Sequence, residues 1–212
     1  MPADVPAALA DLAAAFATLR VRWYVFGAQA VIAAGVPRLT ADIDVTVEAP
    51  RGGAHALTLA LARHGIELRE VGDVASFIAE TRVIPAFHRA SRLPIDIVLA
   101  GPGLEEEMMD RVCRRSVGAV EIPFVATADL IALKLLAGRT KDTEDVRALL
   151  RARPPDLDLA EARARVATLA AMLDDSTLLA TFDRLAAAAP PPPPPPLPFP
   201  PPRRARARTR RR

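Results

Sequence analysis

Two aspartates one residue apart, Asp42 and Asp44, interrupt an apolar stretch of the chain. Side chains alternate between the faces of a strand, so we expect both carboxylates on one face and Ile43, Val45 and Val47 on the other. Two parallel carboxylates repel each other and are costly on a half-buried strand unless a cation joins them. Such oxygen pairs suit Mg²⁺, which completes its coordination with water and substrate phosphates. The alternative is an exposed edge strand with two solvated acids.

A third carboxylate, Asp96, lies inside the apolar stretch 93–99. If that strand is beside the first, three acids converge and can hold two divalent ions for phosphoryl or nucleotidyl transfer. The alternative for Asp96 is a salt bridge to an arginine. Gly27 ends the apolar run 23–27, where a strand-to-helix turn would let the backbone approach a phosphate near the positive end of the next helix.

Lysine is used at only two positions, Lys134 and Lys141, although Lys and Arg together number 28. Retention of a compact ammonium at these two places fits contact with a triphosphate. Asp142 and Asp145 follow at a spacing of three residues. They either orient the lysines or favour the N-terminal end of their own helix.

Composition restricts the class of protein. The 212 residues are enough for one domain with an appendage. The single cysteine, Cys113, excludes an internal disulfide and fits a reducing compartment. His55, His64 and His88 lack metal-ligand spacing, so we discount a zinc site. The N-terminus lacks the basic segment of a signal peptide and no apolar stretch is long enough to span a bilayer, so we expect a cytoplasmic protein.

Apolar periodicity predicts the elements of an α+β domain. We expect helices at 5–20, 28–34, 54–64, 73–80, 104–115, 128–137, 141–151, 159–173 and 176–188. The predicted strands are 22–26, 41–47, 66–71, 83–88, 93–99 and 120–125. Thr127 and Thr140 are the expected N-caps of two of these helices. Residues 1–125 would form the core, and 126–189 a helical C-terminal part of the same domain.

The segment 190–212 differs from the rest of the chain. Eleven of the thirteen residues at 190–202 are proline, and seven arginines follow without any acid. This composition predicts a disordered tail with an extended polyproline stretch. The net charge is +3 for the whole chain and therefore −4 for residues 1–189. The basic tail would tether RNA or another polyanion, or it is a low-complexity extension without a role.

The motifs together resemble the nucleotidyltransferase superfamily, in particular small AbiEii-type toxins. The family's first motif is a strand, Gly-Ser or Gly-Gly, a helix and Asp-x-Asp, which here reads Phe26-Gly27-Ala28 followed by Asp42-Ile43-Asp44. Stretches 133–137 and 139–146 resemble its second and third motifs, with Lys134, Asp142 and Asp145 at the matching places. The likeness covers roughly residues 20–150. It implies a mixed sheet flanked by helices.

By this resemblance, Asp42 and Asp44 bind Mg²⁺ that carries a nucleoside triphosphate. Asp96 binds a second metal or acts as base, and Lys134 is the fourth catalytic residue. The nucleotide-binding set would be Gly27, Ala28, Arg38, Thr40, Lys134 and Lys141.

The expected function is transfer of a nucleoside monophosphate to RNA, notably tRNA ends, or to a protein. A cognate antitoxin is the expected partner. Ala28 replaces the family's small hydroxyl or second glycine, so a catalytically weak or inactive module that binds nucleotide or a partner protein is the alternative. A third hypothesis is an antitoxin-like scaffold with an acidic body.

Overall fold

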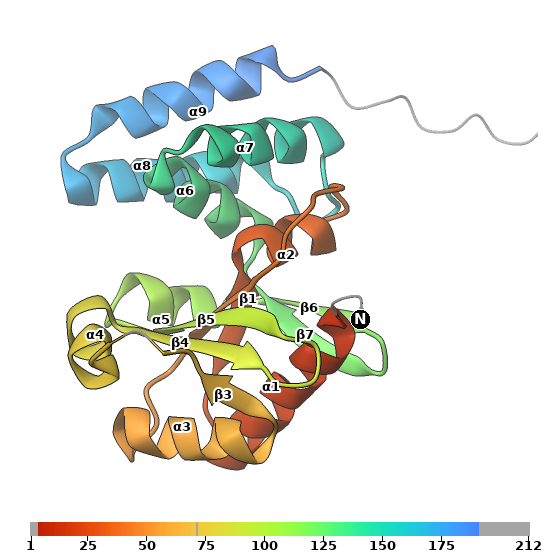
Figure 1. Ribbon diagram of the computed structural model, residues 1–212. Coiled ribbons are helices and arrows are strands. Elements are labelled where there is room, and N and C mark those ends of the chain that lie inside the picture. Colours follow the sequence, from red (N-terminus) through yellow and green to blue (C-terminus); the bar gives the residue numbers. More distant parts are fainter. Residues whose placement is uncertain (1–3, 71, 191–212) are drawn as a thin grey trace, which may run out of the picture.

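A single mixed sheet forms the centre of the molecule, as the computed structural model shows for residues 4–70 and 72–190 (Figure 1). The strands are β1 (Trp23–Phe26), β2 (Ile43–Val47), β3 (Ile66–Leu68), β4 (Val83–His88), β5 (Leu93–Leu99), β6 (Cys113–Val117) and β7 (Val120–Phe124). Their spatial order is β3-β4-β5-β2-β1-β7-β6. The predicted α+β class and the mixed sheet are confirmed.

Helices cover both faces of this sheet. They are α1 (Val5–Leu19), α2 (Gly27–Ala33), α3 (Gly53–Arg63), α4 (Val74–Thr81), α5 (Leu104–Met109), α6 (Thr127–Ala137), α7 (Thr140–Ala152), α8 (Leu159–Leu173) and α9 (Ser176–Ala188). Figure 1 shows α1 and α3 beneath the sheet, and α6 to α9 stacked on its other side with α2 between. We call α6 to α9 the helical layer.

The alternation expected for the aspartate strand is confirmed. Ile43, Val45 and Val47 are fully buried in the core that β2 shares with α1 and α3. Burial of each such side chain contributes about 2 kcal/mol, and this fixes which face of β2 points inward. The opposite face, which carries Asp44, is therefore turned toward the helical layer.

Strand pairing places the acidic residues side by side. β2 pairs in parallel with β5, and Asp44 lies opposite Asp96. β2 also pairs antiparallel with β1, where Phe26 lies opposite Asp44. Neighbours in register share a face, so both carboxylates emerge on the side of the helical layer. An edge strand with solvated acids is excluded, because β2 is the central strand of the sheet.

The predicted helix at 104–115 is wrong in its second half. α5 ends at Met109, and Cys113–Val117 forms the edge strand β6, which pairs with β7 in a hairpin through Gly118. The acidic start and basic end of this segment resembled the charge pattern of a helix dipole. Two of the arginines instead bind distant acids: Arg111 contacts Asp129, and Arg115 contacts Asp156.

Both predicted threonine caps are also wrong. Thr127 and Thr140 are the first residues of α6 and α7, and the N-cap positions are Ala126 and Arg139, neither of which makes a side-chain cap. The Thr127 hydroxyl donates instead to Asp156 at 2.7 Å. The hydroxyl thus donates to a tertiary carboxylate, whereas a capping hydroxyl would accept from a backbone N–H of the first turn.

The remaining boundaries agree with the sequence to within a few residues. Strands β4 and β5 and helices α8 and α9 begin and end where predicted. The division at residues 125 and 126 stays a prediction, although the last strand does end at Phe124. The predicted tail lies outside the described residues from 191 onward. Among the described helices, none is long and apolar enough to cross a membrane.

A buried ion pair ties the helical layer to the sheet layer and yields a stability prediction. Arg111 donates from Nε and Nη2 to Asp129 at 3.1 Å, and Asp129 is 1% exposed. Asp129→Ala removes the buried carboxylate and leaves Arg111 only a longer contact of 3.6 Å with the exposed Glu107, so we expect the unfolding free energy to fall by about 3 kcal/mol in urea titrations. Asp183→Ala, which removes an exposed pair with Arg163, should leave the midpoint unchanged. Equal losses in both variants would contradict this.

Candidate active site

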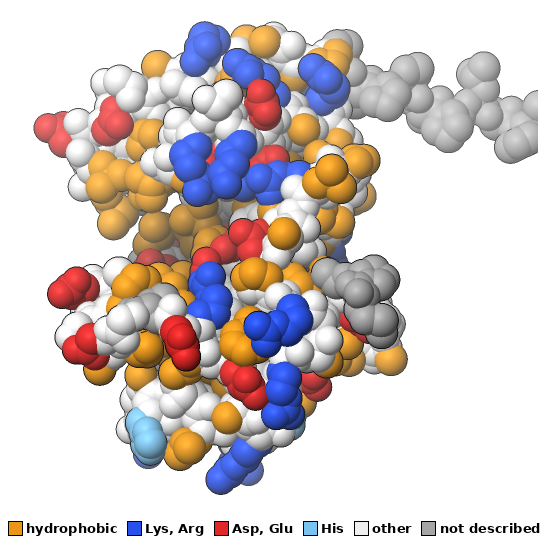
Figure 2. All heavy atoms as spheres, viewed as in Figure 1, with side chains coloured by type: hydrophobic (Ala, Val, Ile, Leu, Met, Phe, Trp, Pro, Cys, Tyr) orange, Lys and Arg blue, Asp and Glu red, His pale blue; other side chains and the backbone are white. Residues whose placement is uncertain are grey.

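A cavity of about 620 Å³ lies between the sheet and the helical layer. Most of the residues singled out from the sequence line it, although they come from separate elements and connecting loops. Figure 2 shows acidic side chains in the hollow between the layers and basic side chains on the helical layer beside it. The lining includes Gly27, Ala28, Arg38, Thr40, Asp42, Asp44, Asp96, Lys134, Arg139, Lys141 and Asp142.

The Asp42 carboxylate is positioned by its own loop and by α2. Its carboxylate accepts a hydrogen bond from the Thr40 hydroxyl. Its backbone carbonyl accepts one from Nε2 of Gln29 at 3.2 Å, and Gln29 is 7% exposed. A buried amide of this kind needs a partner, and here the partner is the peptide that leads into β2. Sequence inspection missed Gln29, because a single glutamine in an apolar helix carries no pattern.

Gly27 leaves room for the second carboxylate. Its φ is +65°, and a Cβ at this position would overlap the carboxylate of Asp44. A side chain here would be strained by the backbone and would displace the acid. The close approach of Gly27 to Asp44 is thus a reason for glycine that the sequence did not reveal; the predicted contact with a phosphate stays a prediction.

The three acids oppose one another electrostatically. Burial, followed by the charges of Asp42 and Asp96, raises the pKa of Asp44 from 3.8 to about 6. The positive charges of Lys134 and Arg139 act in the other direction but do not offset this. A carboxylate with a raised pKa in a cavity marks a candidate functional site. The carboxylates of Asp42 and Asp44 line the same cavity and fit the oxygen donors that Mg²⁺ takes from proteins.

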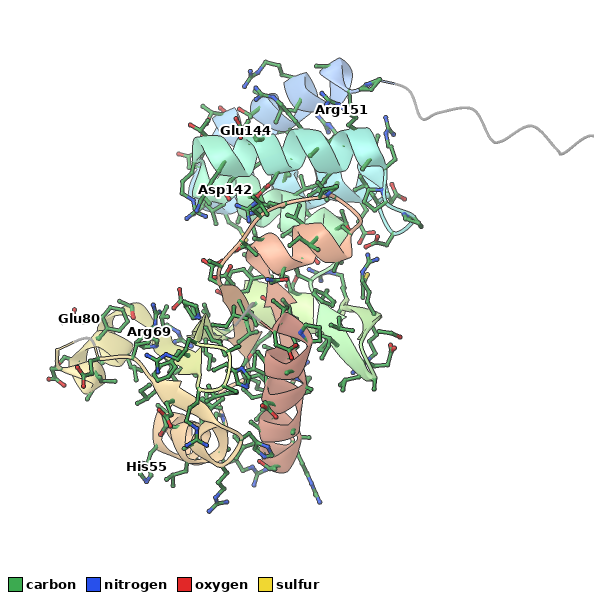
Figure 3. The ribbon with its side chains drawn as sticks, turned by 45° about the vertical axis from the view of Figure 1, so that its right-hand side comes forward. His55, Arg69, Glu80, Asp142, Glu144 and Arg151 are labelled. Atoms are coloured by element: carbon green, nitrogen blue, oxygen red, sulfur yellow. The ribbon has the colours of Figure 1, made fainter. Side chains whose placement is uncertain are left out.

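Lys134 is held by the two aspartates that follow it. Its Nζ lies 3.1 Å from Asp142 Oδ1 and 2.7 Å from Asp145 Oδ2, and its side chain is 6% exposed. The hypothesis that these acids orient the lysine is confirmed for Lys134. Asp142 also lies in the first turn of α7, so the second explanation applies to it as well. Figure 3 labels Asp142 at the edge of the helical layer.

Two arginines complete this network from either side. Arg38 Nε lies 2.9 Å from Asp145 Oδ1, and Arg139 Nε lies 2.5 Å from Asp142 Oδ2. Burial works to raise the pKa of Asp142, but hydrogen bonds from Arg139 and Lys134 outweigh it and hold the pKa below its usual value. Asp142 therefore stays ionised, and the network places three positively charged side chains at the wall of the cavity.

Asp96 lies on a strand beside that of Asp44, and it also forms a salt bridge with an arginine. It lies beside Asp44 in the cavity wall, and its Oδ1 forms an ion pair with Nη2 of Arg69. Within the described part of the chain, no three acidic, histidine or cysteine side chains are arranged to hold one metal ion. Binding of metal by Asp96 therefore stays a prediction. Arg69 was missed, since no sequence pattern links it to a residue 27 positions away.

The raised pKa of Asp44 gives a pH prediction. The metal-free folded state binds this proton more tightly than the unfolded chain, so the contribution is complete below about pH 4 and is lost as pH rises through about 6. The stability of the natural protein relative to Asp44→Asn should therefore fall by about 3 kcal/mol across this window. Urea titrations without divalent ions at pH 4, 5, 6 and 7 measure it, and a pH-independent difference would contradict it.

Comparison of the whole fold identifies related structures. The solution structure of the antibiotic-resistance factor ANT(2'')-Ia has a TM-score of 0.55 at 16% identity, with 79% of this chain and 92% of that chain covered. The crystal structure of an antigenic nucleotidyltransferase-like protein from Paracoccidioides brasiliensis has a TM-score of 0.51 at 15% identity, with 85% and 94% covered. Identities this low establish the fold alone. A comparison with curated protein sequences gives no match.

The sequence itself carries the family assignment. The profile of the family described as "Nucleotidyl transferase AbiEii toxin, Type IV TA system" matches residues 10–210, nearly the whole chain. The match includes the segments from which Asp42, Asp44, Asp96 and Lys134 converge. Family and fold agree: the chain is a nucleotidyltransferase and belongs to the AbiEii family of type IV toxin–antitoxin systems.

Proposed function

We propose that this protein transfers a nucleoside monophosphate from a nucleoside triphosphate to an RNA acceptor, tRNA included, with Mg²⁺ as cofactor. The register that places Asp44 beside Asp96 carries the proposal, because it gathers acids from β2 and β5 at one wall of the cavity. The opposite wall supplies Arg139 and Lys141, whose charges suit the triphosphate. A protein acceptor is the second outcome that the assay below distinguishes.

In this proposal Asp42 and Asp44 hold the metal ion, and Thr40 and Gln29 keep Asp42 in place. Bound Mg²⁺ would neutralise phosphate charge and orient the triphosphate for in-line attack. Asp96 accepts the proton of the acceptor hydroxyl. The acceptor oxygen then bonds to the α-phosphorus, and the bond from that phosphorus to the bridging oxygen breaks. Pyrophosphate leaves with the electron pair.

The basic residues of the cavity act at the leaving side of the reaction. Arg139 and Lys141 line the cavity near its rim, where they can balance the charge that develops on pyrophosphate. The ammonium of Lys134 is already bound by Asp142 and Asp145, so in this proposal it acts on the site through its charge and not by direct contact with a phosphate. Its electrostatic influence reaches Asp44, whose pKa it lowers against the larger effects of burial and neighbouring acids.

The second candidate function is a nucleotide-binding module with little or no catalysis. Ala28 favours it, since this residue lines the cavity and has no hydroxyl to offer a phosphate. Only backbone amides remain at that position. The family further indicates a cognate antitoxin as partner, and the single cysteine is in keeping with a role in the cytoplasm.

Transfer of label tests the proposed function. Purified protein is incubated with Mg²⁺, each α-³²P-labelled triphosphate in turn, and total RNA. We expect label in RNA from at least one triphosphate, and its loss by at least a thousandfold in Asp44→Ala, because one metal carboxylate is gone. Asp183→Asn, an exposed control, should retain activity. Label on protein alone would identify the other acceptor class, and binding without transfer would contradict catalysis.

Substitution of Ala28 by serine tests the cost of the missing hydroxyl. A new hydrogen bond to a phosphate oxygen is worth about 1 kcal/mol, so Ala28→Ser should lower KM for the triphosphate roughly fivefold. Because the contact is equal in the ground and transition states, kcat should change little. Steady-state kinetics at saturating RNA measure both constants. An unchanged or higher KM would show that the backbone alone suffices at this position.

A further inference from the structure

Arg69 lies on a line of residues that crosses the sheet into the candidate site. Its backbone N–H donates to the carbonyl of Pro85 at 2.9 Å, which continues the β3–β4 pairing beyond Leu68. Pro85 lies opposite Asp96, and Asp96 lies opposite Asp44. Residues on such a line share one face of a sheet. Arg69 therefore belongs to the same face as the acids, two strands from Asp96.

The Arg69 side chain reaches across the intervening strand to the third acid. Its Nη2 forms an ion pair with Oδ1 of Asp96, while Oδ2 is not engaged by this contact. Pro85, between them, presents no charge that competes. Nε of Arg69 is buried and has no hydrogen-bond partner among the described residues. An orphaned buried donor costs stability, so this placement of the guanidinium is not the one that stability alone would favour.

The pair changes what Asp96 can hold. A divalent ion shared by Asp44 and Asp96 would lie against the guanidinium, and like charges at contact distance repel strongly. Asp42 and Asp44 are not engaged in this way: no arginine or lysine forms an ion pair with either within residues 4–70 and 72–190. Asp96 is therefore already paired with a guanidinium, whereas Asp42 and Asp44 have no positively charged partner among the described residues.

We propose that Arg69 takes the place of a second metal ion. The site binds a single divalent ion at Asp42 and Asp44, and Arg69 holds Asp96 by one oxygen so that the other faces the acceptor hydroxyl. The inference rests on the proposed function, which it deepens. Arg69 is thus a positioning residue, since it acts through Asp96. Figure 3 shows Arg69 in the sheet layer, apart from Asp142 in the helical layer.

Counting bound metal ions tests this role independently of turnover. The protein is dialysed to equilibrium against Mn²⁺ and a non-hydrolysable analogue of each of the four triphosphates, and Mn²⁺ is measured per bound analogue. We expect one Mn²⁺ in the natural protein and two in Arg69→Gln. The double variant Arg69→Gln/Asp96→Asn should return to one. Arg89→Gln is the matched control, because Arg89 makes an exposed pair with Glu67 near the same edge of the sheet.

Arg69→Met provides a second substitution that retains side-chain bulk, and circular dichroism confirms that each variant is folded. Two ions in the natural protein would overturn the inference, whatever the variants do. One ion in both Arg69 variants would also overturn it, because removal of the guanidinium would then open no second site. Two ions with intact label transfer would reject the role of Arg69 alone; no bound ion in any protein would reject the metal site of the proposed function.

Discussion

Mutual repulsion of carboxylates on the central strand is the interaction around which this structure is organised. Asp44 and Asp96 are adjacent because β2 and β5 pair in parallel register, and Asp42 follows from its place one residue before β2. The core on the other face of β2 fixes this arrangement, since a shift of one residue would bury the acids and expose Ile43 and Val45. Packing of the hydrophobic core thus brings the carboxylates together, and positive charges are needed to offset their repulsion.

Basic side chains of the protein offset part of this repulsion. Arg69 neutralises Asp96, and the helical layer brings Lys134 and Arg139 close enough to oppose the pKa rise of Asp44. The ammonium of Lys134 is itself fixed by Asp142 and Asp145. Buried networks of this kind contribute less to stability than to a defined geometry. Among the described residues, Asp42 and Asp44 have no basic ion-pair partner, and in the proposed function an external cation binds there.

Geometry also explains why the site spans two layers. The acids come from the sheet and the residue before β2, whereas Lys134, Arg139 and Lys141 come from α6, α7 and the segment between these helices. A triphosphate with its metal ion would therefore join the layers by contacts to both. The pair between Arg111 and Asp129 already holds them together in its absence. The cavity is thus formed before any ligand binds, which lowers the entropic cost of binding.

Much of this could be predicted from the sequence, because the informative patterns are local. Alternation around Asp42 and Asp44 gave the buried face of β2, and periodicity gave most element boundaries. The errors arose where contacts with residues distant in the sequence determine the local structure. Arg111 and Arg115 looked like the end of a helix because their acids, Asp129 and Asp156, follow much later in the chain.

The same limit applies to the site. Gln29 and Arg69 act through tertiary contacts, to Asp42 and Asp96, that no spacing encodes. Gly27 was recognised as a turn residue, but its clearance for Asp44 requires coordinates. The order of the strands could not be predicted either, because hydrophobic patterning does not show which strands are neighbours. The acids of β2 and β5 come together only if these two strands are adjacent.

The position of a bound divalent ion tests the account most directly. Crystals grown with Mn²⁺ and a non-hydrolysable triphosphate analogue allow the ion to be located from its anomalous scattering. The account predicts a peak in contact with the carboxylates of Asp42 and Asp44 and with phosphate oxygens of the analogue. A triphosphate bound in the cavity with no ion at these two carboxylates, or an ion held elsewhere in the chain, would contradict it.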